Sequence, residues 1–169
     1  MVKKKNYTPA GKAWRMALCV IVPLAVGGIS ALMTSTAMQQ FGKMNQPFLA
    51  PPAWLFPVAW TLLYTLMGLA SYFIFMAGEK GMKREKDISR TALTIYGVQL
   101  VFNFCWSLIF FGLEWYWLAL VWLLAMWGMI IALIVKTHKI SKIGMWLLVP
   151  YLLWTTFAAY LNLMIAILN

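Results

Sequence analysis

The sequence predicts an all-α integral membrane protein, a single domain over residues 1–169 built as a bundle of five transmembrane helices. Hydrophobic residues make up 63% of the chain and charged residues only 11%, whereas soluble domains are about 25% charged. The mean hydropathy is +0.79. Charged positions divide the chain into five uncharged runs, and each can cross a bilayer once, since a spanning helix needs roughly 20 apolar residues. These runs are Met16–Gly42, Met44–Gly78, Thr91–Leu113, Trp115–Val135 and Ile143–Asn169.

The basic residues are distributed unevenly around these runs. They precede the first run, separate the second from the third, and separate the fourth from the fifth, while only Lys43 lies on the opposite side. The positive-inside rule therefore predicts that the N-terminus lies inside and the C-terminus outside. We expect the basic loops to contact anionic lipid headgroups, which accounts for the net charge of +10 without a nucleic-acid partner.

We expect helices at about 14–37, 53–77, 89–112, 115–135 and 144–168. The first run is longer than the apolar part of a cleaved signal peptide, roughly 7–15 residues, so we interpret it as a helix that is retained. Asp87 or Ser89 is the candidate N-cap of the third helix. External loop 1, at about 38–52, contains amides and three prolines and cannot lie in lipid. A loop of this length serves as a lid or as a connector, and its composition allows both.

The first helix carries a row of small residues on one face. Pro23, Gly27, Ser30, Ala31 and Thr34 follow one another at three- and four-residue steps. Small residues at this spacing let a neighbouring helix approach closely. The row indicates either plain helix packing or a thin wall beside a ligand.

The stretch Pro51–Tyr72 joins a proline-rich start to an apolar helix without a charge. Rigid rings and fixed φ angles pre-form a concave surface, so this stretch indicates the mouth of a pocket. An interfacial belt of aromatic residues would explain Trp54, but it does not explain Tyr64, which lies two to three turns into the helix.

The third and fifth helices each carry a stripe of aromatic and amide side chains. Such groups avoid lipid and face the interior of the bundle, where they form interhelical hydrogen bonds or line a polar cavity. The first stripe comprises Tyr96, Gln99, Asn103, Trp106 and Phe110, and the second comprises Trp146, Pro150, Trp154, Ala158 and Asn162.

Catalytic and metal-binding groups are scarce in the sequence. No acidic residue lies inside any of the five expected helices, and His138, the single histidine, lies among lysines. Cys19 and Cys105 match neither a disulfide framework nor a metal cluster. We therefore predict no catalytic residue, no metal site and no ion coupling. A cavity of rings and amides would suit a large, flat, apolar ligand.

Three blocks of the sequence resemble the translocator protein family, also known as tryptophan-rich sensory proteins or peripheral benzodiazepine receptors. They read PPAWLFPVAWTLLYTLMGLASY from residue 51, QLVFNFCWSLIFFG from residue 99 and LLVPYLLWTTFAAYLN from residue 147. The resemblance extends over nearly the whole chain beyond the basic N-terminus and favours a bacterial-type member. The uneven distribution of the basic residues fits the bacterial cell membrane.

The resemblance implies a homodimeric five-helix bundle that binds porphyrins such as protoporphyrin IX, haem-related tetrapyrroles and other flat hydrophobic molecules. No cofactor is required. The implied pocket lies within the bundle under loop 1. Matched by motif position, its lining would be Trp54, Tyr64, Asn103, Trp106, Phe110, Phe111, Trp154, Ala158 and Leu161.

The chain departs from the family pattern at three places. The family often has Pro-Ser-Trp before the proline pair, whereas this chain has Pro47, Phe48 and Leu49, so a lid tryptophan is missing. Phe104 replaces a tryptophan that often follows the helix 3 asparagine. The cholesterol consensus of animal members is also absent near Asn162, so cholesterol recognition is not supported.

Three functions follow from these observations. A receptor or sensor for tetrapyrroles explains both the stripes and the family blocks, and it is the function that we favour. A transporter of such ligands uses the same cavity, but no coupling residue supports it. Light-dependent breakdown of bound porphyrin is the enzyme-like alternative, for which the chain offers no acid–base group.

Overall fold

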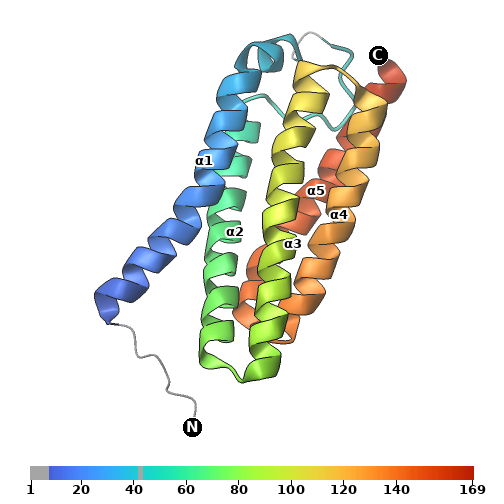
Figure 1. Cartoon of the computed structure of the whole chain (residues 1–169). Helices are drawn as coiled ribbons and strands as arrows, with labels where there is room; N and C mark the ends of the chain where they lie inside the picture. The colour runs from blue at the N-terminus through green and yellow to red at the C-terminus, as the bar shows by residue number, and fades with distance from the viewer. Residues whose placement is uncertain (1–7, 42–43) are drawn as a thin grey trace.

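The structure is a computed structural model that describes residues 8–41 and 44–169, with backbone only for residues 36–41. The described chain contains five helices long and apolar enough to span a membrane. They are α1 (Pro9–Phe41), α2 (Leu55–Lys80), α3 (Lys83–Ser107), α4 (Tyr116–His138) and α5 (Lys142–Leu168) (Figure 1). A π-helical turn, η1 (Leu108–Gly112), continues α3. The predicted all-helical, five-span fold is thereby confirmed, whereas the inside and outside assignment stays a prediction.

Several helices are longer than the uncharged runs that predict them. α1 begins at Pro9, where the Gly11 amide donates to the Thr8 hydroxyl at 3.3 Å, and proline suits the first helical position. α3 begins at Lys83, so the charged stretch after α2 is mostly helix. Uncharged runs therefore mark the apolar part of a helix and miss the charged turns that continue beyond it.

The predicted N-cap of α3 is wrong. Met82 occupies the cap position without a side-chain hydrogen bond, and Asp87 and Ser89 lie inside the helix. The Ser89 hydroxyl is buried and donates to the carbonyl oxygen of Ile74 on α2 at 2.9 Å. The Ser89 hydroxyl therefore bonds to the neighbouring helix and not to the start of its own helix. Gly78 on α2 leaves room for this contact, because a Cβ at Gly78 would lie 2.5 Å from the Ser89 side chain.

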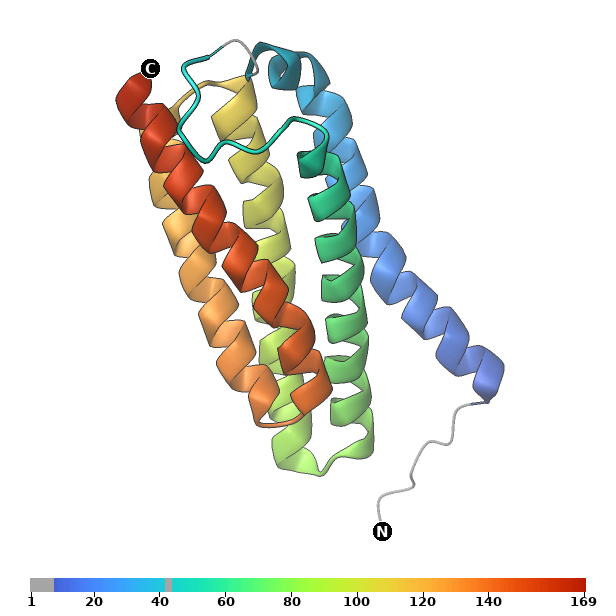
Figure 2. The ribbon, with the colours of Figure 1, turned by 180° about the vertical axis from the view of Figure 1, so that it is seen from behind.

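The helices form one bundle in which α2 contacts α1, α3 and α5, while α4 contacts α3 and α5. α1 diverges from the other helices toward its N-terminal end (Figures 1 and 2). Gly68 marks the close approach of α1 and α2, since a Cβ there would lie 2.6 Å from the carbonyl oxygen of Cys19. A glycine is required at this position for the two backbones to come so near.

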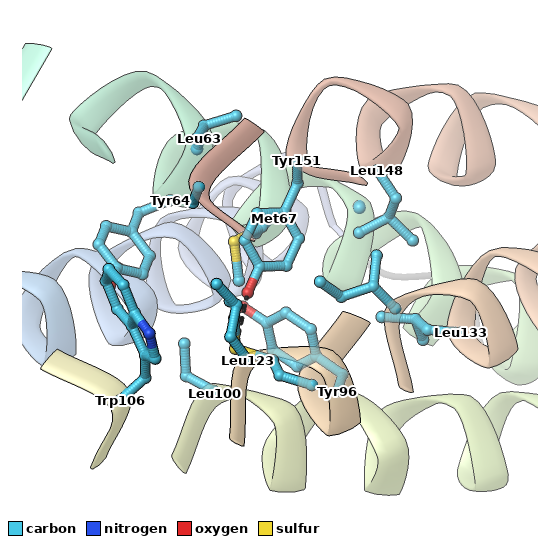
Figure 3. Packing of buried hydrophobic residues seen from close by; sticks show 14 of the residues in the cluster. Leu63, Tyr64, Met67, Tyr96, Leu100, Trp106, Leu123, Leu133, Leu148 and Tyr151 are labelled. Atoms are coloured by element: carbon cyan, nitrogen blue, oxygen red, sulfur yellow. Dashed lines mark hydrogen bonds between the residues drawn. The ribbon is translucent and has the colours of Figure 1, made fainter. Parts of the chain in front are cut away.

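The interior of the bundle is filled by one hydrophobic cluster, part of which is drawn in Figure 3. Its members include Met67, Ile74, Leu123 and Met126, all at most 1% exposed. Large apolar residues such as Leu32, which is 78% exposed, cover the outside. Such an apolar surface suits contact with lipid chains.

Candidate ligand-binding pocket

A chain of hydrogen bonds joins three helices in the middle of the bundle. The Tyr64 hydroxyl donates to Oδ1 of Asn103 at 2.5 Å, and Nδ2 of Asn103 donates to the Tyr151 hydroxyl at 3.0 Å. The Tyr151 hydroxyl donates to Oε1 of Gln99 at 2.7 Å. All four residues are buried. Because an unpaired polar group is costly inside a membrane, these bonds hold α2, α3 and α5 together.

A second set of bonds lies nearer to loop 1. The indole N–H of Trp106 donates to Oδ1 of Asn162 at 3.2 Å, and Nδ2 of Asn162 donates to the carbonyl oxygen of Tyr116 at 2.8 Å. These bonds connect α3, α5 and α4. The amides of the predicted stripes therefore serve largely in interhelical hydrogen bonds. The sequence had left open whether they form such bonds or line a polar cavity.

A cavity of about 80 Å³ lies beside these bonds, between α1, α2 and the end of α3 with η1. One wall is aromatic: the ring centroids of Trp60 and Tyr64 are 5.4 Å apart and stacked, and those of Trp60 and Trp106 are 6.4 Å apart. The opposite wall is built from small and hydroxyl side chains of α1. The lining comprises Gly27, Ser30, Ala31, Thr34, Pro57, Trp60, Tyr64, Trp106, Ser107 and Phe111.

Three of the site residues implied by the resemblance line this cavity: Tyr64, Trp106 and Phe111. Tyr64 and Trp106 lie at one end of the buried cluster in Figure 3, away from Leu133 and Leu148.

Two further site residues support the lining from behind. Asn103 accepts the hydrogen bond of the Tyr64 hydroxyl. Phe110 stacks on Trp106 with a centroid distance of 5.3 Å.

The remaining site residues lie outside the cavity. Trp54 occupies the N-cap position of α2 and is 65% exposed. On α5, Ala158 and Leu161 are buried, and the ring of Trp154 meets Phe56 edge-on at 6.3 Å. None of these three α5 residues is part of the lining. The cavity is therefore bounded by α1. The motif positions had implied that α5 forms part of its wall.

The α1 wall was absent from the implied site, although the sequence contained a signal for it. The row of small residues that starts at Pro23 was compatible with a thin wall beside a ligand, and four of its members line the cavity. At Gly27 a Cβ would collide with the ring of Tyr64, so glycine is needed for the two helices to close on each other. Trp60 was also absent from the implied site, although it precedes Tyr64 by four residues and therefore shares its face.

Loop 1 is attached to the end of α5. The backbone N–H of Asn45 donates to Oδ1 of Asn169 at 3.2 Å, and Nδ2 of Asn169 donates back to the Asn45 carbonyl at 3.3 Å. Leu49, at the position of the missing lid tryptophan, is 55% exposed, and its neighbour Phe48 is 98% exposed. Lys43, the one basic residue expected on the loop 1 side, lies outside the described residues.

The described residues contain no group of three or more histidine, cysteine or carboxylate side chains that could hold a metal ion. Cys19 and Cys105 are both free and partly buried. The chemistry available at the cavity is therefore ring stacking, contact with apolar surface and hydrogen bonding to hydroxyl or indole groups.

Comparison with known proteins agrees with this architecture. The model of the TspO/MBR family matches residues 19–168. The chain is 36% identical over 155 residues to the tryptophan-rich protein TspO of Chlorobaculum tepidum, covering 91% of this chain and 95% of that protein. It is 35% identical to the tryptophan-rich sensory protein of Cereibacter sphaeroides, over 72% of each chain. It is 33% identical to the translocator protein of Homo sapiens, over 79% of this chain and 76% of the human one.

The family match covers most of the chain, and two of these relatives are named as a sensory protein and a translocator protein. The five apolar helices agree with a multi-pass membrane protein. The chain therefore belongs to the TspO/MBR family of membrane sensory and translocator proteins.

Proposed function

We propose that this protein is a membrane receptor that binds tetrapyrroles such as protoporphyrin IX in the cavity between α1, α2 and α3. The observation that carries the proposal is the aromatic wall, in which Trp60 stacks on Tyr64 and stands next to Trp106. Flat, rigid rings bind a flat apolar molecule by stacking at low entropic cost. The hydroxyl groups of Ser30 and Thr34 on the facing wall supply polar contacts.

The cavity must enlarge to admit such a ligand. Its volume of about 80 Å³ is well below the roughly 300–1,000 Å³ of pockets that hold drug-sized molecules. The aromatic wall is held by the bonds of Tyr64 to Asn103 and of Trp106 to Asn162. The α1 wall is thin, and α1 already diverges from the bundle toward its N-terminal end (Figure 2). Displacement of α1 is therefore the opening movement that the proposal requires.

The test is to fill the cavity from the α1 side. Ala31 and Ala25 are both exposed residues of α1, but only Ala31 lines the cavity. Ala31→Phe should place a ring in the space that the ligand needs, and Ala25→Phe adds the same ring on the outer surface. Binding is measured by titrating the purified protein in detergent with protoporphyrin IX and following the absorbance of the porphyrin.

We expect Ala31→Phe to weaken binding by at least about tenfold, a free-energy difference of about 1.4 kcal/mol, while Ala25→Phe binds like the parent. Equal binding by both variants would place the ligand elsewhere. No saturable binding by the parent protein would refute the proposed function itself. Unchanged thermal unfolding of both variants in detergent serves as the control for folding.

A further inference from the structure

The first turn of α3 and the last turn of α4 lie at the opposite end of the bundle from loop 1 (Figure 1). A second hollow is lined by residues of these two turns and the residues next to them. Its volume is about 560 Å³. Four of its six lining residues are cationic, and the full lining comprises Lys83, Arg84, Asp87, Ile88, Lys136 and Lys139. The hollow is separate from the aromatic cavity, with which it shares no residue.

The cations of this hollow outnumber its carboxylates by four to one. Asp87 is the single carboxylate of the lining. Glu85, in the same turn of α3, is partly buried, lies close to Gly81 and does not line the hollow. Several like charges around one space repel each other, and an anion placed among them would relieve that repulsion.

The start of α3 adds to this preference for an anion. Met82 at the cap position makes no side-chain cap hydrogen bond. The first N–H groups of a helix have no partner within the helix, and they carry partial positive charge. Glu85 in this first turn meets part of that preference, so the attraction of the hollow for an anion comes mainly from its cations.

The position of the hollow indicates where the anion comes from. It lies at the ends of two helices that can span a membrane, Lys83–Gly112 with η1 included and Tyr116–His138. Charged residues at such ends lie at the level of the lipid headgroups. Ile88 gives the hollow an apolar element next to the cations. A phosphate that is attached to acyl chains fits this combination better than a free phosphate does.

We propose that the hollow between α3 and α4 is a binding site for the headgroup of an anionic phospholipid of the phosphatidylglycerol type. The phosphate lies among Lys83, Arg84, Lys136 and Lys139. The carboxylate of Asp87 accepts a hydrogen bond from a hydroxyl group of the glycerol headgroup. This site goes beyond general attraction of basic loops to a negative membrane surface, because it requires particular residues of two helices.

The experiment compares two variants with the same change in charge. Arg84→Gln with Lys139→Gln removes two cations of the hollow. Lys80→Gln with Arg90→Gln removes one lysine and one arginine at the same end of the bundle, both exposed and outside the lining. Each full-length protein is purified in neutral detergent and titrated with dioleoyl phosphatidylglycerol or dioleoyl phosphatidylcholine. Bound lipid is counted by native mass spectrometry, and circular dichroism checks that both variants are folded.

We expect the parent and the Lys80/Arg90 variant to bind phosphatidylglycerol in preference to phosphatidylcholine. The Arg84/Lys139 variant should bind phosphatidylglycerol about tenfold more weakly or worse. Asp87→Asn should lower the preference for phosphatidylglycerol over phosphatidic acid, which lacks the glycerol headgroup. Equal losses in the two charge variants would overturn the site in favour of general electrostatics. Full competition by millimolar inorganic phosphate would overturn the assignment to lipid.

Discussion

Removal of the Tyr151 hydroxyl tests whether the buried hydrogen-bond chain holds the bundle together. Tyr151→Phe deletes two bonds, one donated to Gln99 and one accepted from Asn103. Interhelical bonds in membrane proteins contribute about 0.6 kcal/mol each on average. Buried groups left without a partner add a penalty of about 1–3 kcal/mol. Because Gln99 and Asn103 are 0% exposed, we expect a loss of about 2–3 kcal/mol in the free energy of unfolding.

The assay is unfolding of the purified protein in mixed micelles by increasing the fraction of sodium dodecyl sulfate, followed by tryptophan fluorescence. Tyr160→Phe is the matched control, since Tyr160 is partly buried at the α5 surface and stacks on Phe157. It should change stability by less than about 0.5 kcal/mol. Adding Gln99→Leu to Tyr151→Phe should recover part of the loss, because apolar replacement of both partners is less costly than replacement of one. A Tyr151→Phe protein as stable as the parent would refute the reasoning.

Three further predictions concern the α1 contact, loop 1 and the orientation. Gly68→Leu should destabilise the bundle by more than about 2 kcal/mol in the same assay, because even a Cβ at this position would lie 2.6 Å from the α1 backbone. Gly128→Ala is the control and should be neutral or stabilising, because a Cβ at Gly128 would meet nothing within 4 Å. Asn169→Ala removes two bonds to loop 1 and should speed amide hydrogen exchange there, while exchange in α4 stays unchanged; equal rates in loop 1 would contradict this. A membrane-impermeant maleimide on intact cells should label Phe48→Cys and not Met82→Cys, both exposed positions; the reverse pattern would invert the predicted orientation.

For the polar stripe of the third helix, the residue spacing predicts which side chains are buried but not which partners they meet. A spacing of three and four residues places Tyr96, Gln99, Asn103 and Trp106 on one face, and all of them are buried. The spacing cannot say which group lies opposite each side chain. In the structure the Asn103 amide hydrogen-bonds to Tyr64 on α2 and to Tyr151 on α5. It therefore links helices and does not line the cavity.

The α5 residues illustrate a second limit. Trp154, Ala158 and Leu161 belong to a sequence block shared with the family, yet they lie outside the cavity of this structure. A shared motif shows that the same residue type occurs at a matching position of the sequence. Whether that residue lines a cavity depends on how closely the helices pack. Here Gly27 and Gly68 bring α1 against α2, and the small side chains of α1 become the wall.

The sequence by itself determined the number of spans, the all-helical class and the family, because the length of an uncharged run and the order of motif residues are properties of the chain read along its length. Only the tertiary structure decided which faces meet. It assigned the amides to interhelical bonds, placed α1 as the thin wall of the aromatic cavity and brought the basic ends of α3 and α4 around one hollow. These outcomes depend on contacts between residues far apart in the chain, which no local pattern specifies.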